Sequence, residues 1–165
     1  MGEYAPAEAD LDAAGMCLAV VAGRFNEHIT SRLVDGASKT LAARGATEAV
    51  QVYWVPGAFE IPLVAKRLAA SGTVDAIICL GAVVRGETAH FEYVAGPCAS
   101  GVAAAALDTG VPIVFGVLTT DDEEQALDRA GGREGNKGSE AALTAIEMVR
   151  LLRSLPPTRS ESGPC

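Results

Sequence analysis

The stretch DAIICLGAVV, Asp75–Val84, decides the fold of this chain. After its first residue it is apolar or glycine throughout, without the alternation of polar and apolar residues that marks a half-exposed strand. Such a run is typical of a central strand in a parallel sheet, because helices cover both faces of that kind of sheet. We therefore expect Asp75–Val84 to lie in the middle of the fold.

Outward from this strand, the chain alternates between short apolar runs and segments with helical periodicity. Further strands are expected at Met16–Ala22, Glu48–Trp54 and Pro112–Leu118. Helices are expected at Ile29–Leu41, Phe59–Ala70, Phe91–Asp108, Asp121–Ala130 and Lys137–Leu152, and a loop at 131–136. This alternation, with right-handed crossovers, predicts an α/β fold: a three-layer αβα sandwich with a four-stranded parallel sheet, flavodoxin-like.

Length fits one domain. The 165 residues leave no room for two full cores at the usual ~100–200 residues per domain. We expect a single domain over residues 16–153, preceded by an N-terminal extension over residues 1–15. Residues 154–165 are rich in Pro and Ser and are expected to form a flexible tail.

Charge and hydropathy exclude several function classes. Acidic residues outnumber basic ones 21 to 13, which gives a net charge of −8. A uniformly acidic protein repels phosphate backbones and anionic lipid, so neither nucleic acid nor a membrane surface is an expected partner. No apolar run reaches the ~18–20 residues of a membrane span. The start, Met1–Tyr4, lacks a signal pattern, so a cytoplasmic location is expected.

The four cysteines show no CxxC spacing, so neither a zinc ribbon nor a thioredoxin-type redox site is expected. Cys17 and Cys79 lie inside apolar runs, and we expect both to be small buried hydrophobes. No metal site is predicted.

Ligands of an open parallel α/β sheet bind outside the carboxyl ends of its strands. The segments expected there are Gly23–Asn26, Val55–Glu60, Val84–His90 and the end of the fourth strand, Phe115–Thr120. Three of the few aromatic residues, Phe25, Phe59 and Phe115, are expected at this edge. Flat apolar faces beside amide and carboxylate groups suit a planar heterocycle with polar substituents. The alternative is that the phenylalanines simply cap the core.

Candidate chemistry is carried by a histidine and by possible phosphate ligands. His90 follows a glycine-containing loop and starts a helix, and its imidazole suits proton transfer near neutral pH; the alternative is a helix-capping histidine. His28 is expected on the surface. Gly86–Thr88 resembles a small anion cradle.

Two basic residues flank the loop 131–136. Either Arg129 or Lys137 could neutralise a phosphate, the arginine by a two-pronged contact. The alternative is an ordinary surface pairing with Asp128 and Glu134.

Three familiar signatures are absent from the sequence. The first strand is not followed by GxGxxG, which weakens a dinucleotide-binding interpretation. Neither the phosphate-loop pattern GxxxxGK[ST] nor the nucleophile elbow GxSxG occurs, so a phosphate-loop nucleotide hydrolase and a hydrolase of the nucleophile-elbow type are not expected.

Seven stretches in register give the chain a specific resemblance. They are GRFN at 23–26, VPGAFEIP at 55–62, LGAVVRGETAHFEYV at 80–94, FGVLT at 115–119, EQA at 124–126, RAG at 129–131 and GNKG at 135–138. Together they resemble the lumazine synthases over about residues 17–153. The resemblance implies condensation of 5-amino-6-(D-ribitylamino)uracil with 3,4-dihydroxy-2-butanone 4-phosphate to 6,7-dimethyl-8-ribityllumazine, phosphate and water, in riboflavin biosynthesis. It implies neither a metal nor an organic cofactor.

The resemblance also assigns roles to individual residues. His90 would transfer protons, Glu87 and Thr88 would bind the phosphate, and Arg129 would pair with it. The other implied substrate-binding residues are Phe25, Asn26, Ala58, Phe59, Glu60, Ala82, Val83, Val84, Phe115 and Lys137. In this family the site lies between subunits, and Phe115, Arg129 and Lys137 would come from the neighbour. Glu87 departs from the pattern, because a small residue is common there, and Phe25 stands where many relatives carry tryptophan.

The resemblance also implies an oligomeric state, and it leaves alternative functions open. The family forms pentamers through small-residue helices such as 98–108, and the short link 131–136 resembles that of members that build a 60-subunit icosahedral shell. Three other functions stay open: an archaeal-type riboflavin synthase, a non-catalytic flavin- or lumazine-binding module, and a container protein of the same fold.

Overall fold

Four parallel strands form the centre of the structure, a computed structural model that describes residues 11–47 and 49–156. They are β1 (Leu18–Gly23), β2 (Gln51–Val55), β3 (Ala76–Val84) and β4 (Ile113–Thr120), in the order β2-β1-β3-β4. β1 is buried along its whole length, and β3 is buried except at its last residue, Val84, which is half-buried. The apolar run at 75–84 thus forms an inner strand, as predicted.

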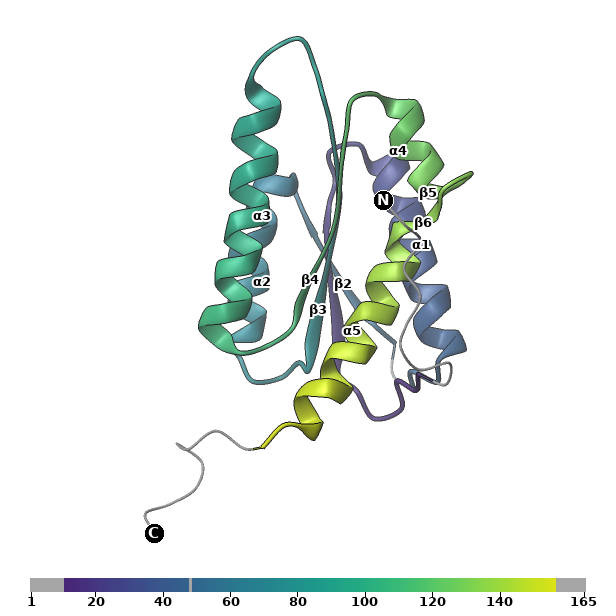
Figure 1. Cartoon of the computed structure of the whole chain (residues 1–165), viewed down its shortest axis with the longest axis vertical. Coiled ribbons are helices and arrows are strands. Elements are labelled where there is room, and N and C mark those ends of the chain that lie inside the picture. Colours follow the sequence, from purple (N-terminus) through teal and green to yellow (C-terminus); the bar gives the residue numbers. More distant parts are fainter. Residues whose placement is uncertain (1–10, 48, 157–165) are drawn as a thin grey trace.

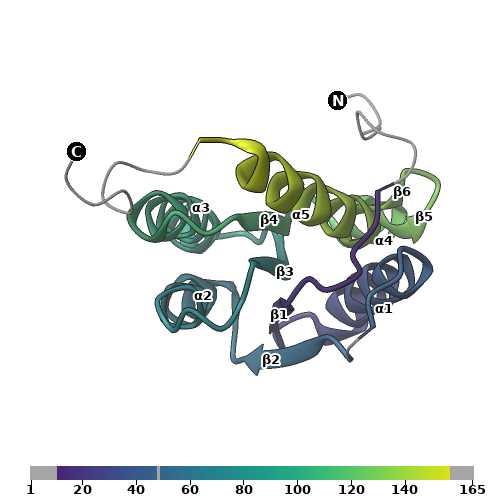
Figure 2. The same ribbon diagram turned by 90° about the horizontal axis from the view of Figure 1, so that it is seen from below.

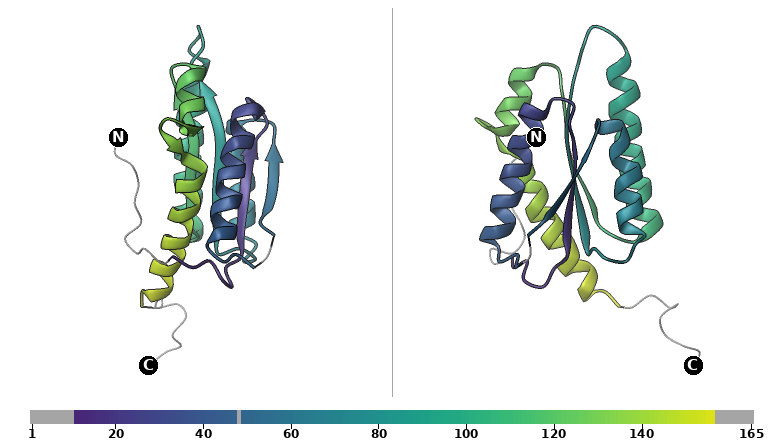
Figure 3. Two further views of the ribbon diagram at one scale, coloured as in Figure 1. Left: turned by 90° about the vertical axis from the view of Figure 1, so that its right-hand side faces the viewer. Right: turned by 180° about the vertical axis from the view of Figure 1, so that it is seen from behind.

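Helices cover both faces of the sheet, as Figures 1 and 2 show. One face carries α2 (Ile61–Ala69) and α3 (His90–Thr109), and the other carries α1 (Glu27–Ala43), α4 (Glu123–Arg129) and α5 (Lys137–Ser154). The view from behind in Figure 3 shows the same two helix layers with the sheet between them. The predicted three-layer α/β sandwich is confirmed.

The helices form where the sequence supplies an apolar stripe. In α1, the side chains of Ile29, Leu33, Ala37 and Leu41 are fully buried, at the predicted four-residue spacing. Full burial of a large aliphatic side chain contributes about 1.5–3 kcal/mol. The α1 side and the α2/α3 side of the sheet have separate apolar cores, so the sheet is clamped from both faces.

A glycine allows the two longest helices on one face to cross closely. A Cβ on Gly138, at the start of α5, would lie 2.0 Å from the carbonyl oxygen of Leu33 in α1. No side chain fits in that space, so the start of α5 rests directly on the α1 backbone. Asn136 caps α5 by accepting from the N–H groups of Gly138 (2.9 Å) and Ser139 (3.2 Å).

Several local expectations need correction. Residues 131–136 form no plain loop but a small antiparallel hairpin, β5 (Ala130–Gly132) and β6 (Gly135–Asn136). The glycines there permit the tight reversal, with positive φ at Gly131 and Gly135. The helix expected from residue 59 begins with a 3₁₀ turn, Ala58–Glu60, and continues as α2.

The two cysteines in apolar runs behave differently. Cys79 is buried in β3, as expected. Cys17 is exposed, so its predicted burial is wrong. β1 begins only at Leu18, and the Cys17 backbone N–H donates instead to the Asp75 carboxylate at 2.7 Å.

The domain limits 16–153 stay a prediction. Leu11 and Ala13, within the expected N-terminal extension, are buried against the α1-side core. α5 continues to Ser154, and residues 157–165 of the expected tail lie outside the described part of the chain.

Candidate active site

The loops after β1 and β2 lie together at the carboxyl ends of the strands. The backbone N–H of Arg24 donates to Val55 O at 2.8 Å, and that of Phe25 donates to Pro56 O at 3.0 Å. A Cβ on Gly57 would lie 3.3 Å from Glu60 Oε2 and 3.9 Å from the Phe25 Cβ. The aromatic side chain and the carboxylate therefore flank one glycine.

Asn26 ties this corner to β3. Its side-chain Nδ2 donates to the carbonyl oxygen of Ala82 at 3.0 Å. Its backbone has a φ of 58° immediately before α1, in the left-handed region that asparagine tolerates better than most residues. The side-chain contact therefore joins the first loop to the strand that precedes His90.

Two phenylalanine side chains stand largely in the open at this edge. Phe25 is 73% exposed and Phe59 is 57% exposed, whereas Ala58 between them in sequence is buried. The core-capping alternative for these two residues therefore does not hold. Glu60 is half-buried, and its carboxylate makes no hydrogen bond or ion pair with the described residues, whereas its backbone N–H donates to Gly57 O at 3.3 Å. We call the loops after β1, β2 and β3 that carry Phe25, Phe59, Glu60 and His90 the rim.

The loop after β3 is the most open part of the rim. Glu87, Thr88 and His90 are all exposed. His90 is the first residue of α3, and its backbone N–H donates to Thr88 Oγ1 at 3.4 Å. Below the loop, Ala82 and Val83 are buried and Val84 is half-buried, so they reach a ligand chiefly through backbone groups.

Phe115 does not lie at the rim, contrary to the sequence-based expectation. It pairs with Cys79 in the middle of β3, whereas the ends of these strands pair Val84 with Thr120. Five residues separate it from the end of β4, about 16 Å along a strand. The expectation failed because an apolar run does not reveal its register against a neighbouring strand.

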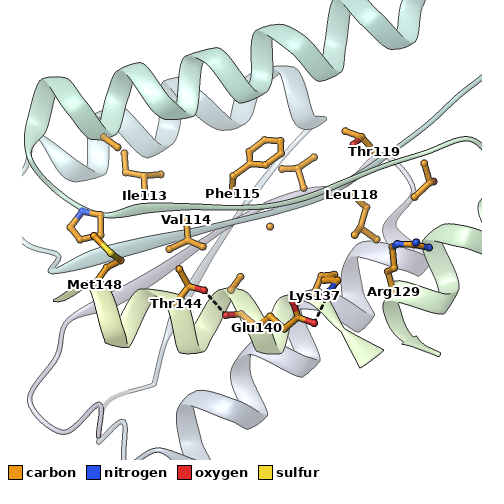
Figure 4. A pocket seen from close by; sticks show the side chains of 16 residues that line it. Ile113, Val114, Phe115, Leu118, Thr119, Arg129, Lys137, Glu140, Thr144 and Met148 are labelled. Atoms are coloured by element: carbon orange, nitrogen blue, oxygen red, sulfur yellow. Dashed lines mark hydrogen bonds and ion pairs between the residues drawn. The ribbon is translucent and has the colours of Figure 1, made fainter. Parts of the chain in front are cut away.

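Phe115 instead lines a groove along the outer strand. The groove has a volume of about 700 Å³ and follows β4 between α3 and α5. Figure 4 shows Phe115 on the α3 side of the strand, and Arg129 and Lys137 on the side of α4 and α5. Within the described residues, no strand pairs with the outer side of β4. We call this feature the β4 groove.

The two basic residues of the groove differ in their partners. Lys137 forms an ion pair with Glu140 at 2.7 Å, and its side chain is only 24% exposed. Arg129 donates to the backbone oxygen of Gln125 at 3.1 Å and makes no ion pair with the described residues. The guanidinium of Arg129 is thus the more available anion ligand.

The surface pairing expected as an alternative for Arg129 belongs to another residue. Asp128, in α4, pairs at 2.6 Å with Arg133, in the turn of the β5–β6 hairpin. The Arg133 guanidinium lowers the pKa of the Asp128 carboxyl, chiefly through its side-chain hydrogen bonds. His28 is exposed and pairs with Glu123 at 2.7 Å, which confirms it as a surface residue.

One chain therefore places the candidate site residues in two separate groups. The loops with Phe25, Phe59 and Glu60 lie together, and the loop that leads to His90 follows the neighbouring strand β3 at the same end of the sheet. The β4 groove holds Phe115, Arg129 and Lys137 at a different place, on the outer side of the edge strand.

Further groups emerge that the sequence did not single out. Glu140, Thr144 and Met148 of α5 line the groove, and Arg85 braces the loop after β3. A three-to-four-residue spacing along α5 is the one sequence signal that places the first three on a common face.

Neither metal nor membrane features are found in the described residues. No group of three or more His, Cys, Asp or Glu side chains is placed to hold a metal ion among residues 11–47 and 49–156. In the same part of the chain, every helix is too short or too polar to cross a bilayer.

The fold is that of a flavodoxin-like α/β protein, and the rim lies at the carboxyl ends of its parallel sheet, where proteins of this class bind small molecules. The chain belongs to the 6,7-dimethyl-8-ribityllumazine synthase family, whose model matches residues 15–153. A 6,7-dimethyl-8-ribityllumazine synthase of Syntrophus aciditrophicus is 59% identical over 149 residues, which cover 90% of this chain and 97% of that protein. One of Thermus thermophilus is 60% identical over 146 residues, 88% of this chain and 93% of that protein.

This membership confirms the resemblance seen in the sequence. The chain is an enzyme of the lumazine synthase family, a transferase of riboflavin biosynthesis. The comparisons do not favour a non-catalytic binding module or a container protein.

Proposed function

We propose that the rim and the β4 groove of this chain are the two halves of the site that condenses 5-amino-6-(D-ribitylamino)uracil with 3,4-dihydroxy-2-butanone 4-phosphate. The convergence of Phe25 and Glu60 on Gly57 carries this proposal. It sets an exposed aromatic face beside a half-buried carboxylate without a described partner. That combination suits a flat heterocycle that bears a polyhydroxylated side chain.

The rim residues would hold the pyrimidine substrate. Phe25 stacks on the uracil ring, and Ala58, Phe59 and Glu60 hold the ring and its ribityl chain, the carboxylate accepting from hydroxyl groups. The backbone groups of Ala82, Val83 and Val84 contact the pyrimidine edge, with Asn26 fixing the loop beside them.

The loop after β3 would hold the four-carbon substrate and manage protons. Glu87, through its backbone, and the Thr88 hydroxyl bind the phosphate. His90 transfers protons as the amine attacks the ketone, the imine forms, phosphate leaves and the ring closes with loss of water. An imidazole can both accept and donate a proton, so it can serve at several of these steps.

Positioning would supply much of the rate. Holding two reactants face to face turns a bimolecular encounter into a local one, which contributes about 7–11 kcal/mol at best. The proposed condensation requires neither a metal nor an organic cofactor.

We also propose that a second copy of the chain completes each site. In a single chain, Phe115, Arg129 and Lys137 line a groove separate from the rim, and the outer edge of β4 is open among the described residues. A neighbour's groove placed against the rim would bring its Arg129 guanidinium to the phosphate. Head-to-tail contacts of this kind close into a ring when the rotation between neighbours permits it, and a pentamer is the ring that the family resemblance implies.

Two finer points belong to this proposal. The short hairpin between Arg129 and Lys137 favours a shell of 60 subunits, and light scattering tests it: a mass of one pentamer at all concentrations would contradict the shell. The cytoplasm is the proposed location, which suits the free thiols of Cys17, Cys79 and Cys98.

The activity is tested by mixing the protein with both substrates and following lumazine fluorescence and phosphate release together. The proposal requires both signals, in equal amounts. Lumazine supplied alone tests the riboflavin synthase alternative: riboflavin formed from lumazine, with no condensation activity, would overturn the proposed reaction.

A further inference from the structure

Arg85 occupies a junction at the base of the loop after β3. It is the first residue beyond β3, and its backbone N–H donates to the carbonyl oxygen of Thr120, the last residue of β4, at 2.9 Å. The residues that follow, 86–89, form the exposed loop that leads into His90.

The Arg85 side chain joins three segments around this loop. Its Nη1 donates to Glu92 Oε1 at 2.5 Å, in the first turn of α3. Its Nε donates to Asp121 Oδ1 at 3.1 Å, just after β4. The guanidinium also lies over the Phe91 ring, 4.1 Å from the centroid. The planar fork of arginine allows these contacts to form together.

The loop has little else to fix it. Within the described residues, the hydrogen bonds found inside it are those from the N–H of His90 to Thr88 Oγ1 (3.4 Å) and from the N–H of Glu92 to Ala89 O (3.1 Å). The link from Arg85 to Glu92 closes the chain between residues 85 and 92 into a ring. A charge-assisted hydrogen bond across so short a segment restricts the conformations that the loop can reach.

We propose that Arg85 is a positioning residue for the condensation, which acts through Glu92 and Asp121 to hold Thr88 and His90 in their working places. This inference rests on the proposed function of the loop. Two carboxylates already neutralise the guanidinium, so Arg85 is not itself a phosphate ligand. The same contacts raise the pKa of Arg85 and lower that of Glu92.

A stabilising role alone would not account for the cluster. Arg85, Glu92 and Asp121 are all about half exposed or more, and ion pairs between such groups add little to the free energy of unfolding. The contacts are informative because they surround the one loop that carries both the proposed phosphate ligands and the proton-transfer residue.

The test separates the two substrates kinetically. In Arg85→Gln, KM for the four-carbon phosphate should rise about two- to fivefold and kcat should fall by a similar factor, so that kcat/KM falls by about 4- to 25-fold, which is within the range expected for the loss of two exposed charged contacts. KM for the pyrimidine, which the rim holds through Phe25, Phe59 and Glu60, should change by less than about twofold. Glu92→Gln should reproduce this split, and the double variant should be no worse than Arg85→Gln. Arg85→Lys keeps the positive charge but lacks the planar fork of the guanidinium, so its KM and kcat should lie between those of the wild type and Arg85→Gln.

Three results would overturn the inference. If Arg85 bound phosphate directly, Glu92→Gln would leave that KM unchanged or lower it, because the guanidinium would be released. If Arg85 were merely structural, its loss would lower the unfolding temperature without any difference between the two KM values. Unchanged amide hydrogen exchange at residues 86–90 in Arg85→Gln would also contradict it.

A matched control lies at the other end of α3. Lys66 pairs with Asp108 at 2.8 Å, both similarly exposed, far along the helix from the loop. Lys66→Gln should leave both KM values and kcat unchanged. Wild-type protein that makes no lumazine would overturn the proposed function, and this inference with it. With an active wild type, the variants decide on Arg85 alone.

Discussion

At the scale of single residues, His90 and Arg129 divide the proposed chemistry into proton transfer and phosphate handling. His90→Ala should slow turnover by about 10- to 100-fold without abolishing it, because positioning of the two reactants survives. Steady-state assays with both substrates provide the measurement. An inactive but folded His90→Ala protein would show that proton transfer, not positioning, dominates the rate.

Arg129→Ala should lower activity more than His90→Ala does. Loss of a two-pronged guanidinium contact should lower kcat/KM for the phosphorylated substrate by about 10²–10³-fold, since hydrogen bonds to charged groups are the strong ones. Arg133→Ala, four residues on and engaged with Asp128, is the matched control and should stay close to wild type. Wild-type kinetics in Arg129→Ala would remove that residue from the site.

Sequence patterns located most of these residues but not their register. Asp75–Val84 has no alternation of polar and apolar residues, so its position as an inner strand follows directly from its composition. In α1, the four-residue spacing of the apolar residues determines which face of the helix is buried. Phe115 was misplaced because nothing local shows that it pairs with Cys79. The ring from Arg85 to Glu92 and the contact to Asp121 depend on segments that only the fold brings together.

At the scale of elements, the crossing of α1 and α5 positions the groove. Gly138→Ala should destabilise the protein by about 1–3 kcal/mol or more, because a methyl group would overlap the Leu33 carbonyl and push the start of α5 away. Urea unfolding measures this. Ser139→Ala, one residue on, keeps the N–H that Asn136 caps and should change stability little. Equal stability of Gly138→Ala and wild type would contradict the close crossing.

The ion pair between Asp128 in α4 and Arg133 in the β5–β6 hairpin should make a pH-dependent contribution to the stability of the fold. Arg133 lowers the pKa of Asp128 in the folded state. Its contribution to stability is therefore present above the unfolded pKa, about 3.9, and is lost as the pH falls through the folded value. Arg133→Gln should be less stable than wild type at pH 7, with the difference shrinking as the pH falls below the unfolded pKa of about 3.9. A constant difference across that range would argue against the pair, as would an equal effect of Lys39→Gln, which removes the exposed pair with Asp35 on α1.

At the scale of the whole molecule, the distribution of site residues implies an assembly. The rim lies at the ends of β1, β2 and β3, and the β4 groove lies on the outer edge of the sheet, so one chain presents the two halves of the proposed site at separate places. Such halves meet when copies associate, and a head-to-tail association closes into a ring where the rotation between neighbours permits it. The free chain should therefore lack activity wherever dilution separates the copies.

The most direct measurement mixes two variants that each lack one half of the site. Phe59→Asp disables the rim, Arg129→Ala disables the groove, and each protein alone should be nearly inactive. Co-refolded in equal amounts, they should recover about a quarter of wild-type activity, because a ring with head-to-tail contacts joins an intact rim to an intact groove in one interface of four. Activity that stays at the average of the two variants would show that each chain holds a complete site of its own.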